Sequence, residues 1–391
     1  MRQQLPTPRT HRRIRKHQEA GSVFVPRPLH SAVIVVTGAS SGIGRATALA
    51  FARRGASIVL AARRAAALRN LAAECERLGG RALAVPTDVT DERAVRALAQ
   101  RAVETFGRLD VWVNNAGVAL FSRFEEAPPE VFRRVIETNL LGYVHGARAA
   151  LPLFRHQGSG VLINNASVFG GIGAPYWSAY VTTKFGIRGF SACLRQEVRD
   201  APDIHVCTVL PASIDTPLFQ HGGNYTGRAI KPVRPVYDAE AVAEAIVRLA
   251  ERPRREVFVG AAGRLLLLLH TLLPGLAERL IAFWVERDSL QKRTAPPSPG
   301  NLFQPMPEWT TVSGGWKAGG ALAPRVAVAG LTAIAAILLG RRWLHQRRNP
   351  SAARRLLPNR SPTPPSISAF LIGAASAPAD DRRRRRQPWP R

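Results

Sequence analysis

The stretch that decides the fold reads Thr37-Gly38-Ala39-Ser40-Ser41-Gly42-Ile43-Gly44, between an apolar run at 32–36 and a helical pattern at 45–54. Gly38 permits a tight turn, because glycine accepts positive φ without steric cost. Gly42 lets the backbone approach a phosphate, and Gly44 lets the helix pack closely on the preceding strand. The helix N-terminus offers free N–H groups and a positive dipole end to anions. This order of strand, turn and helix predicts a dinucleotide-binding site.

Short apolar runs alternate with helical patterns along the next 220 or so residues. We predict strands at 32–36, 57–62, 81–86, 111–114, 161–164, 205–210 and 256–259, and helices at 45–54, 64–78, 91–106, 129–153, 178–201 and 238–251. Strands that alternate with helices of about 10–20 residues predict an α/β fold, a doubly wound parallel sheet covered on both faces.

Three polar residues, Ser167, Tyr180 and Lys184, stand at spacings of thirteen and four. Residues four apart share a helix face, so the ammonium of Lys184 lies beside the phenol of Tyr180. A neighbouring cation favours phenolate and is expected to lower the tyrosine pKa from about 10 towards neutrality. Ser167 follows a strand, at the sheet edge where ligands bind, and can hold a substrate oxygen. A Tyr-x-x-x-Lys pair alone is more often a surface helical pair, so the glycine turn is what favours catalysis.

Together these motifs resemble the short-chain dehydrogenase/reductase family over residues 31–260. The resemblance implies a Rossmann fold and an oxidoreductase that interconverts an alcohol and a carbonyl group. It implies that Tyr180 is the general acid/base, that Lys184 lowers its pKa and binds the cofactor ribose, and that Ser167 orients the substrate. Asn139, in Glu-Thr-Asn-Leu-Leu-Gly, matches the residue that supports a proton relay through water.

The resemblance also assigns residues to the cofactor. They are Thr37, Gly38, Ser40, Ser41, Gly42, Ile43, Gly44, Asp88, Val89, Asn115, Ala116, Gly117, Tyr180, Lys184, Pro211, Ile214 and Thr216. Two segments depart from the family pattern. Ala212 replaces a usual glycine, and Asn164-Asn165-Ala166 stands where small residues and serines are common.

Cofactor choice is expected at the end of the second strand, where Ala62 is followed by Arg63. NAD binding calls for a carboxylate there to accept hydrogen bonds from the ribose, and none is present. A guanidinium suits a 2′-phosphate, so Arg63 favours NADP(H) over NAD(H).

The net charge of +28 is concentrated at the two ends of the chain. Residues 1–30 hold seven basic residues against one acidic, and 341–391 hold thirteen arginines against two aspartates. Such tails suit anionic membranes or nucleic acid, but no nucleic-acid-binding motif accompanies them, so specific nucleic-acid binding is not expected.

Residues 1–30 resemble a disordered extension; a transit peptide or an upstream start codon would look the same. Three cysteines without metal spacing favour a reducing, cytoplasmic compartment and no metal site.

Beyond a single catalytic domain at 31–263, the sequence predicts an extension. An apolar, amphipathic helical segment at 264–293 precedes a Pro/Gly/Ser-rich linker at 294–324, a possible membrane segment at 325–344 and a disordered Arg/Pro-rich tail at 345–391. The uncharged run 326–340 would span only about 22 Å as a helix, so a single span, a hairpin and monotopic insertion all stay open. A helix at 265–285 that covers the enzyme's crevice is the competing interpretation.

The leading hypothesis is an NADP(H)-dependent reductase or dehydrogenase acting on a lipophilic carbonyl compound. Substrate contacts are expected from loops 118–124, 170–177 and 218–235, where Phe121, Tyr176 and Trp177 lie, with Phe169 beside them. A homo-oligomer is compatible with the sequence. The rivals are a non-catalytic NADP-binding protein that keeps the fold, which has no need of the four polar groups, and a protein that tethers membrane or nucleic acid.

Overall fold

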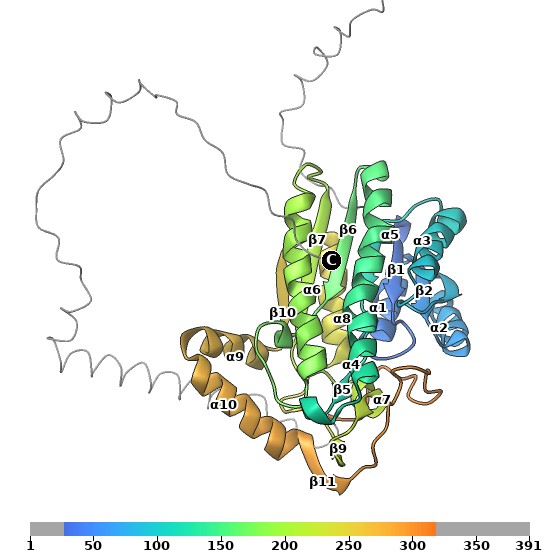
Figure 1. The fold of residues 1–391 in the computed structure, drawn as a ribbon. Coiled ribbons are helices and arrows are strands. Elements are labelled where there is room, and N and C mark those ends of the chain that lie inside the picture. Colours follow the sequence, from blue (N-terminus) through green and yellow to red (C-terminus); the bar gives the residue numbers. More distant parts are fainter. Residues whose placement is uncertain (1–26, 318–391) are drawn as a thin grey trace, which may run out of the picture. The chain divides into compact units, whose positions relative to one another are not determined.

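A sheet of seven parallel strands forms the centre of residues 27–317, the part of the chain described by this computed structural model. The strands are β1 (Val33–Thr37), β2 (Ser57–Ala62), β3 (Arg81–Pro86), β4 (Val111–Asn114), β6 (Gly160–Asn165), β7 (Ile204–Pro211) and β10 (Glu256–Val259). They lie in the order β10-β7-β6-β4-β1-β2-β3 (Figure 1). The predicted doubly wound α/β fold is therefore confirmed.

Helices cover both faces of this sheet. The helices α1 (Gly42–Ala52), α2 (Ala65–Arg77) and α8 (Ala239–Glu251) pack on one face, and α3 (Glu92–Phe106), α5 (Gly142–Gln157) and α6 (Ser178–Glu197) on the other. Successive side chains of a strand point to opposite faces. Along β1, Ile34 and Val36 join the first core while Val33 and Val35 join the second, so an uninterrupted apolar run suits a strand buried on both sides.

The helix expected over 129–153 is interrupted in the structure. It consists of α4 (Pro129–Ile136), a π-helical turn (Glu137–Leu141) and α5. The turn holds Asn139 against the backbone of Val118, and a Cβ on Gly142 would lie 2.8 Å from Val89. Widened turns of this kind are frequent at functional sites, and periodicity does not reveal them.

The order of the strands indicates where the ligand crevice lies. From β1 the chain adds β2 and β3 on one side, and then crosses to β4, β6 and β7 on the other. The crossover point lies between β1 and β4, where ligands bind beyond the carboxyl ends of the strands. Short elements surround that edge: β5 (Leu120–Phe121) pairs with β8 (Gly223–Asn224), and α7 (Leu218–His221) lies between them in sequence, as do 3₁₀ turns at Phe124–Glu126 and Val168–Gly170.

Residues 264–293 form a helical hairpin followed by a strand. Leu273 separates α9 (Ala261–Leu272) from α10 (Pro274–Trp284), and a π-helical turn (Val285–Ser289) leads to β11 (Leu290–Thr294), which pairs with β9 (Arg228–Ile230). Leu266, Leu269 and Ile281 are buried in a core shared with Trp177. The structure thus shows this segment packed over the crevice. None of the helices within 27–317 combines the length and apolar character that crossing a membrane requires.

Residues 298–317, which we call the strap, differ from the expected linker at 294–324. Leu302 is fully buried beside Val118 and Val135, and Asp215 accepts hydrogen bonds from the backbone N–H groups of Gly314 (3.0 Å) and Trp316 (2.9 Å). The sequence predicts a linker because Pro, Gly and Ser favour irregular backbone. Irregular backbone can still pack against a folded domain, as it does here. The expected membrane segment at 325–344 and the tail at 345–391 lie outside the described residues, as does most of the extension at 1–30.

Candidate active site

A cavity of about 610 Å³ opens beyond the carboxyl ends of β1, β2, β4 and β6. Arg63 follows β2 and Ser167 follows β6, with β1 and β4 between those strands. Three strand spacings separate β2 from β6, so these residues lie about 14 Å apart along the cavity. The cavity therefore has an Arg63 end and a Ser167 end.

The glycine turn that follows β1 forms the cavity wall nearest that strand. Gly38 and Gly42 have φ of +66° and +55°. A Cβ on Gly38 would lie 2.7 Å from the Cα of Ala116, and one on Gly44 would lie 2.2 Å from the carbonyl oxygen of Gly38. The missing Cβ of Gly38 lets the turn pack against the segment that follows β4, and the missing Cβ of Gly44 lets the helix pack on the turn.

Most residues that the sequence assigned to the cofactor line the cavity. They are Gly38, Ser40, Ser41, Gly42, Ile43, Arg63, Asp88, Val89, Asn115, Ala116, Gly117, Tyr180, Lys184, Pro211, Ile214 and Thr216. Thr37 and Gly44 are not among the lining residues. The hydroxyl of Thr37 donates to Val113 O (3.2 Å) and accepts from the N–H of Asn115 (2.9 Å), so it ties β1 to β4.

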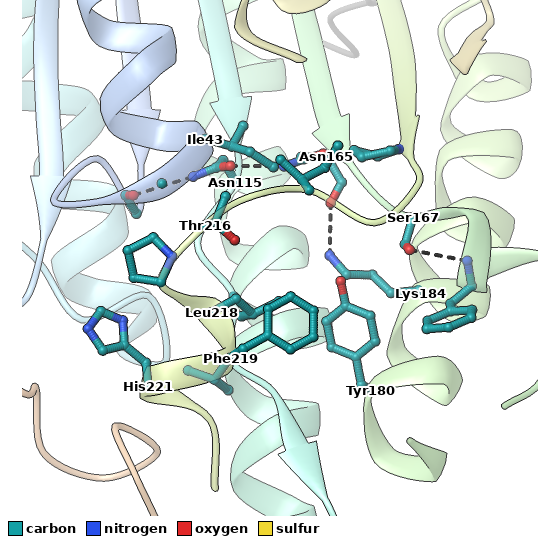
Figure 2. A pocket seen from close by; sticks show the side chains of 18 of the residues that line it. Ile43, Asn115, Asn165, Ser167, Tyr180, Lys184, Thr216, Leu218, Phe219 and His221 are labelled. Carbon is teal, nitrogen blue, oxygen red and sulfur yellow. Dashed lines mark hydrogen bonds between the residues drawn. The ribbon is translucent and has the colours of Figure 1, made fainter. Parts of the chain in front are cut away.

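Buried amides connect the glycine turn to the proton-transfer residues (Figure 2). Asn115 donates from Nδ2 to Thr37 O (2.9 Å) and accepts at Oδ1 from Asn165 Nδ2 (2.9 Å). The carbonyl oxygen of Asn165 in turn accepts from Lys184 Nζ (2.9 Å). The main-chain carbonyl of Asn165 thus holds the lysine, and the Asn165 side chain connects that peptide to Asn115, a role that sequence reasoning missed.

Ser167, Tyr180 and Lys184 meet in the cavity as predicted, but their protonation differs from the expectation. The Lys184 Nζ lies 5.3 Å from the Tyr180 ring centroid. Burial raises the pKa of Tyr180 to about 12, partly opposed by the Ser167 hydroxyl, and burial lowers the pKa of Lys184 to about 7. Desolvation outweighs the expected effect of the cation on the phenol, because both groups lose water and the neutral form of each is favoured.

Asn139 does not line the cavity in this structure. It is fully buried; its Oδ1 accepts from Val118 N (2.8 Å) and its Nδ2 donates to Val118 O (2.9 Å) and to the Thr183 hydroxyl (3.3 Å). Thr183 precedes Lys184 in α6, so Asn139 is connected to the lysine through the helix. The expected proton-relay role of Asn139 stays a prediction.

The Arg63 end is rich in positive charge. Arg63 and Arg64 follow β2, and Arg134 Nη2 lies 2.8 Å from Asp88 Oδ2. The Asp88 carboxylate also accepts from the backbone and hydroxyl of Thr90. Arg64 donates to the hydroxyls of Ser40 and Ser41 (both 3.0 Å). Arg64 is a lining residue that the sequence assignment left out, although its place beside Arg63 was a usable signal.

Aromatic and aliphatic side chains line the Ser167 end. Trp177 lies edge-on to Tyr180 and to Phe121, with ring centroids 5.3 and 4.6 Å apart. Phe169 and Phe219 also contact Trp177. The hairpin adds Leu266, Ile281 and Trp284. This lining agrees with the competing interpretation of residues 265–285, a helix that covers the crevice.

Comparison with known protein sequences identifies related oxidoreductases. The family described as short chain dehydrogenase matches residues 32–224. The uncharacterized oxidoreductase YxnA of Bacillus subtilis is 39% identical over 258 residues, 65% of this chain and 72% of the relative. Dehydrogenase/reductase SDR family member 7B of Bos taurus is 32% identical over 285 residues, 68% of this chain and 85% of the relative.

Solved structures with the same fold hold different cofactors. An alcohol dehydrogenase from Thermococcus sibiricus, complexed with 5-hydroxy-NADP, is 31% identical with a TM-score of 0.51, covering 58% of this chain and 95% of its own. A short-chain dehydrogenase/reductase from Burkholderia phymatum, in complex with NAD, is 25% identical with a TM-score of 0.57, covering 63% and 95%. These two structures support the binding of a nicotinamide dinucleotide by this fold, and they do not distinguish NADP from NAD.

Proposed function

The chain belongs to the short-chain dehydrogenase/reductase family, and from that premise we propose that it interconverts an alcohol and a carbonyl group on a lipophilic substrate with NADP(H). The observation that carries the proposal is the meeting of Ser167, Tyr180 and Lys184 in one cavity with the glycine turn. A binding module would need the turn alone. A protein that transfers protons to a bound substrate needs all three side chains as well.

The cavity lining fits a nicotinamide dinucleotide. Gly38 lets the turn pack against the backbone of Ala116, and the first turn of α1 faces the cavity through Gly42 and Ile43. Helix N-termini of this kind bind phosphates. Lys184 would hold the nicotinamide ribose, and Ile214 and Thr216 the nicotinamide end. When bound, the nicotinamide supplies a hydride for reduction or accepts one in oxidation.

Tyr180 is proposed as the proton donor to the substrate oxygen in reduction. With its pKa raised to about 12, the phenol keeps its proton at neutral pH and can act as an acid. The Ser167 hydroxyl would donate a hydrogen bond to the same oxygen. With its pKa lowered to about 7, Lys184 is about half protonated at neutral pH. As the phenol loses its proton, the protonated form of Lys184 stabilises the phenolate, because opposite charges a few ångströms apart favour the ionised form.

NADP(H) is preferred over NAD(H) in this proposal. No carboxylate follows β2, and the guanidinium of Arg63 lines the cavity there. A 2′-phosphate would meet Arg63, with Arg64 and Arg134 nearby, and charge-assisted hydrogen bonds to a planar guanidinium favour it. The Asp88 carboxylate, already engaged by Arg134 and Thr90, does not replace the missing acidic group.

A screen of carbonyl compounds tests the proposed function. Purified protein is mixed with NADPH and a panel of ketones and aldehydes that includes methyl ketones of increasing chain length, and NADPH absorbance is followed. We expect kcat/KM to rise by up to about fourfold for each additional methylene that the aromatic wall buries, since burial of one is worth about 0.8 kcal/mol. Folded protein that oxidises NADPH with no member of the panel would contradict the proposal.

Membrane association is proposed as a second property. Leu268, Leu272 and Phe283 of the hairpin are each about half exposed, and Arg264 and Arg279 lie on the same two helices. Apolar side chains beside basic ones favour contact with an anionic membrane surface.

We expect full-length protein to float with vesicles that contain anionic lipid, and the double variant Leu268→Ser/Leu272→Ser to lose most of this binding. Leu78→Ser, which changes an exposed leucine of the Rossmann domain, is the control; equal flotation of all three proteins would refute the role of the hairpin.

A further inference from the structure

The strap forms part of the lining at the Arg63 end of the cavity. Asn301, Pro305 and Met306 line the same space as Arg63 and the glycine turn. The Oδ1 of Asn301 is buried and has no hydrogen-bond partner among the described residues. A segment more than 230 residues away from β2 in sequence is therefore a wall of the cavity.

Backbone carbonyls of the strap hold the Arg63 side chain. Its Nη1 donates to Leu302 O (3.3 Å) and Phe303 O (3.0 Å), and its Nη2 donates to Asn301 O. A guanidinium has five N–H donors. None of these three bonds uses the Nε–H, so this donor is left for a phosphate oxygen.

The strap is anchored on both sides of these carbonyls. Leu302 is fully buried, and Arg134 Nε also donates to its carbonyl oxygen (3.1 Å), so the position of this peptide is fixed. Farther along, Thr311 O accepts from Gly42 N (2.9 Å), and Asp215 accepts from the hydroxyl of Ser313 (2.6 Å) and from two backbone N–H groups. A long side chain such as arginine loses rotamer freedom when it binds a ligand, and a fixed set of carbonyls removes that freedom beforehand.

We propose that the strap is a specificity-determining part of the cofactor site, which orients Arg63 for the 2′-phosphate of NADP(H) and closes the adenosine side of the cavity. This inference rests on the proposed use of NADP(H). It assigns positioning roles to the peptides of Asn301, Leu302 and Phe303. Releasing the strap then weakens NADPH more than NADH, because only NADPH carries the group that the oriented guanidinium binds.

Two glycines of the strap offer a matched pair of variants. Gly300 and Gly315 both have positive φ, +52° and +78°. A Cβ on Gly300 would lie 2.2 Å from His221 O and 2.6 Å from Gly222 O, whereas one on Gly315 would meet no atom within 4 Å. Gly300→Ala therefore displaces the strap next to the Arg63 contacts, and Gly315→Ala introduces a comparable backbone strain without a clash. Neither glycine lines the cavity.

The experiment measures dissociation constants of NADPH and NADH by calorimetry in full-length wild type and both variants, and hydrogen exchange of the strap amides without cofactor. In Gly300→Ala we expect faster exchange at 301–317, NADPH binding weakened at least about tenfold and NADH less than about threefold. Gly315→Ala should leave both constants within about twofold. Unchanged or tighter NADPH binding with a released strap would overturn the inference.

A second variant keeps the test decisive if Gly300→Ala does not fold or exchange is unchanged. Asp215→Asn removes the charged acceptor that holds Ser313, Gly314 and Trp316, and Asp215 does not line the cavity. The same selective loss of NADPH is expected, and equal affinity changes for both dinucleotides would refute the inference. Wild-type protein that binds neither dinucleotide, or binds NADH better, would instead refute the proposed function on which the inference rests.

Discussion

The two ends of the cavity are built in different ways. At the Ser167 end, the reacting groups come from the segment after β6 and from α6, within eighteen residues of one another, and burial shifts the pKa values of Tyr180 and Lys184. At the Arg63 end, β2 meets a strap more than 230 residues farther along the chain, and hydrogen bonds from arginines to carbonyls hold the parts together. Desolvation therefore sets the protonation of the groups at the Ser167 end. Docking of the strap backbone positions the groups at the Arg63 end.

This difference separates chemistry from cofactor recognition. A change at the Ser167 end removes a proton donor that has no substitute, so its effect on turnover is large. A change at the Arg63 end removes one of several contacts with a ligand, so its effect is a moderate change in affinity. Variants at the two ends should therefore differ both in size of effect and in the parameter that changes.

The largest effect is expected for Tyr180→Phe. Loss of the phenol hydroxyl removes the only proposed proton donor, so kcat with NADPH and a reactive ketone should fall by about 10²–10⁴-fold, while the dissociation constant of NADPH changes little. Steady-state kinetics and calorimetry provide the two measurements. Tyr176→Phe, which changes a tyrosine outside the cavity lining, should keep its turnover. Near-normal kcat in Tyr180→Phe would show that the Ser167 end does not work by this proton transfer.

A smaller, selective effect is expected for Arg63→Ala. Loss of a charge-assisted contact should weaken NADPH by about 1–3 kcal/mol and NADH by much less, with kcat on saturating NADPH nearly unchanged. Titration with each dinucleotide measures both affinities. The control is Arg53→Ala, which removes an exposed arginine of the same domain. If Arg63→Ala weakened both dinucleotides equally, the guanidinium would not recognise the 2′-phosphate.

The last comparison concerns folding stability and its pH dependence at Lys184, rather than turnover or cofactor affinity. Burial lowers the pKa of this lysine from 10.5 to about 7. Between these values the unfolded chain binds more protons than the folded protein, so the stability contributed by Lys184 rises with pH across that window and is least below about pH 7. We expect Lys184→Met to be more stable relative to wild type at pH 7 than near pH 10, measured as free energy of unfolding in urea.

The exposed Lys292 supplies the control for that comparison. Lys292→Met removes the same positive charge from the surface, so its stability difference from wild type should change little between the two pH values. A difference for Lys184→Met that stays constant or grows with pH would mean that burial does not neutralise this lysine.

The sequence was sufficient for features that depend on local pattern. Four strands begin and end at the predicted residues: Ser57–Ala62, Arg81–Pro86, Val111–Asn114 and Glu256–Val259. Polar or glycine residues follow each short run, so the sequence indicates where each strand ends. The helix predicted at 91–106 also has the expected start, because Asp91 caps α3 and accepts hydrogen bonds from its first turn. The meeting of Ser167, Tyr180 and Lys184 also followed from spacing within a strand and a helix.

Features that depend on contacts between distant residues could not be predicted. The π-helical turn at Glu137–Leu141 holds Asn139 against Val118, a contact that periodicity does not encode. Docking of the strap depends on a pocket for Leu302 and an acceptor at Asp215, both formed only after folding. The reversal of the expected Tyr180 pKa shift depends on how much water the surrounding aromatic residues exclude, and a sequence does not show that balance.

Isotope transfer tests the central claim, that this cavity reduces a carbonyl group with NADPH, most directly. Wild-type protein is incubated with NADPH carrying deuterium at both C4 positions and with the best ketone of the panel, and the product is analysed by mass spectrometry. The account predicts an alcohol with one deuterium, on the carbinol carbon. Bound NADPH with no labelled alcohol, or alcohol that forms without the label, would contradict it.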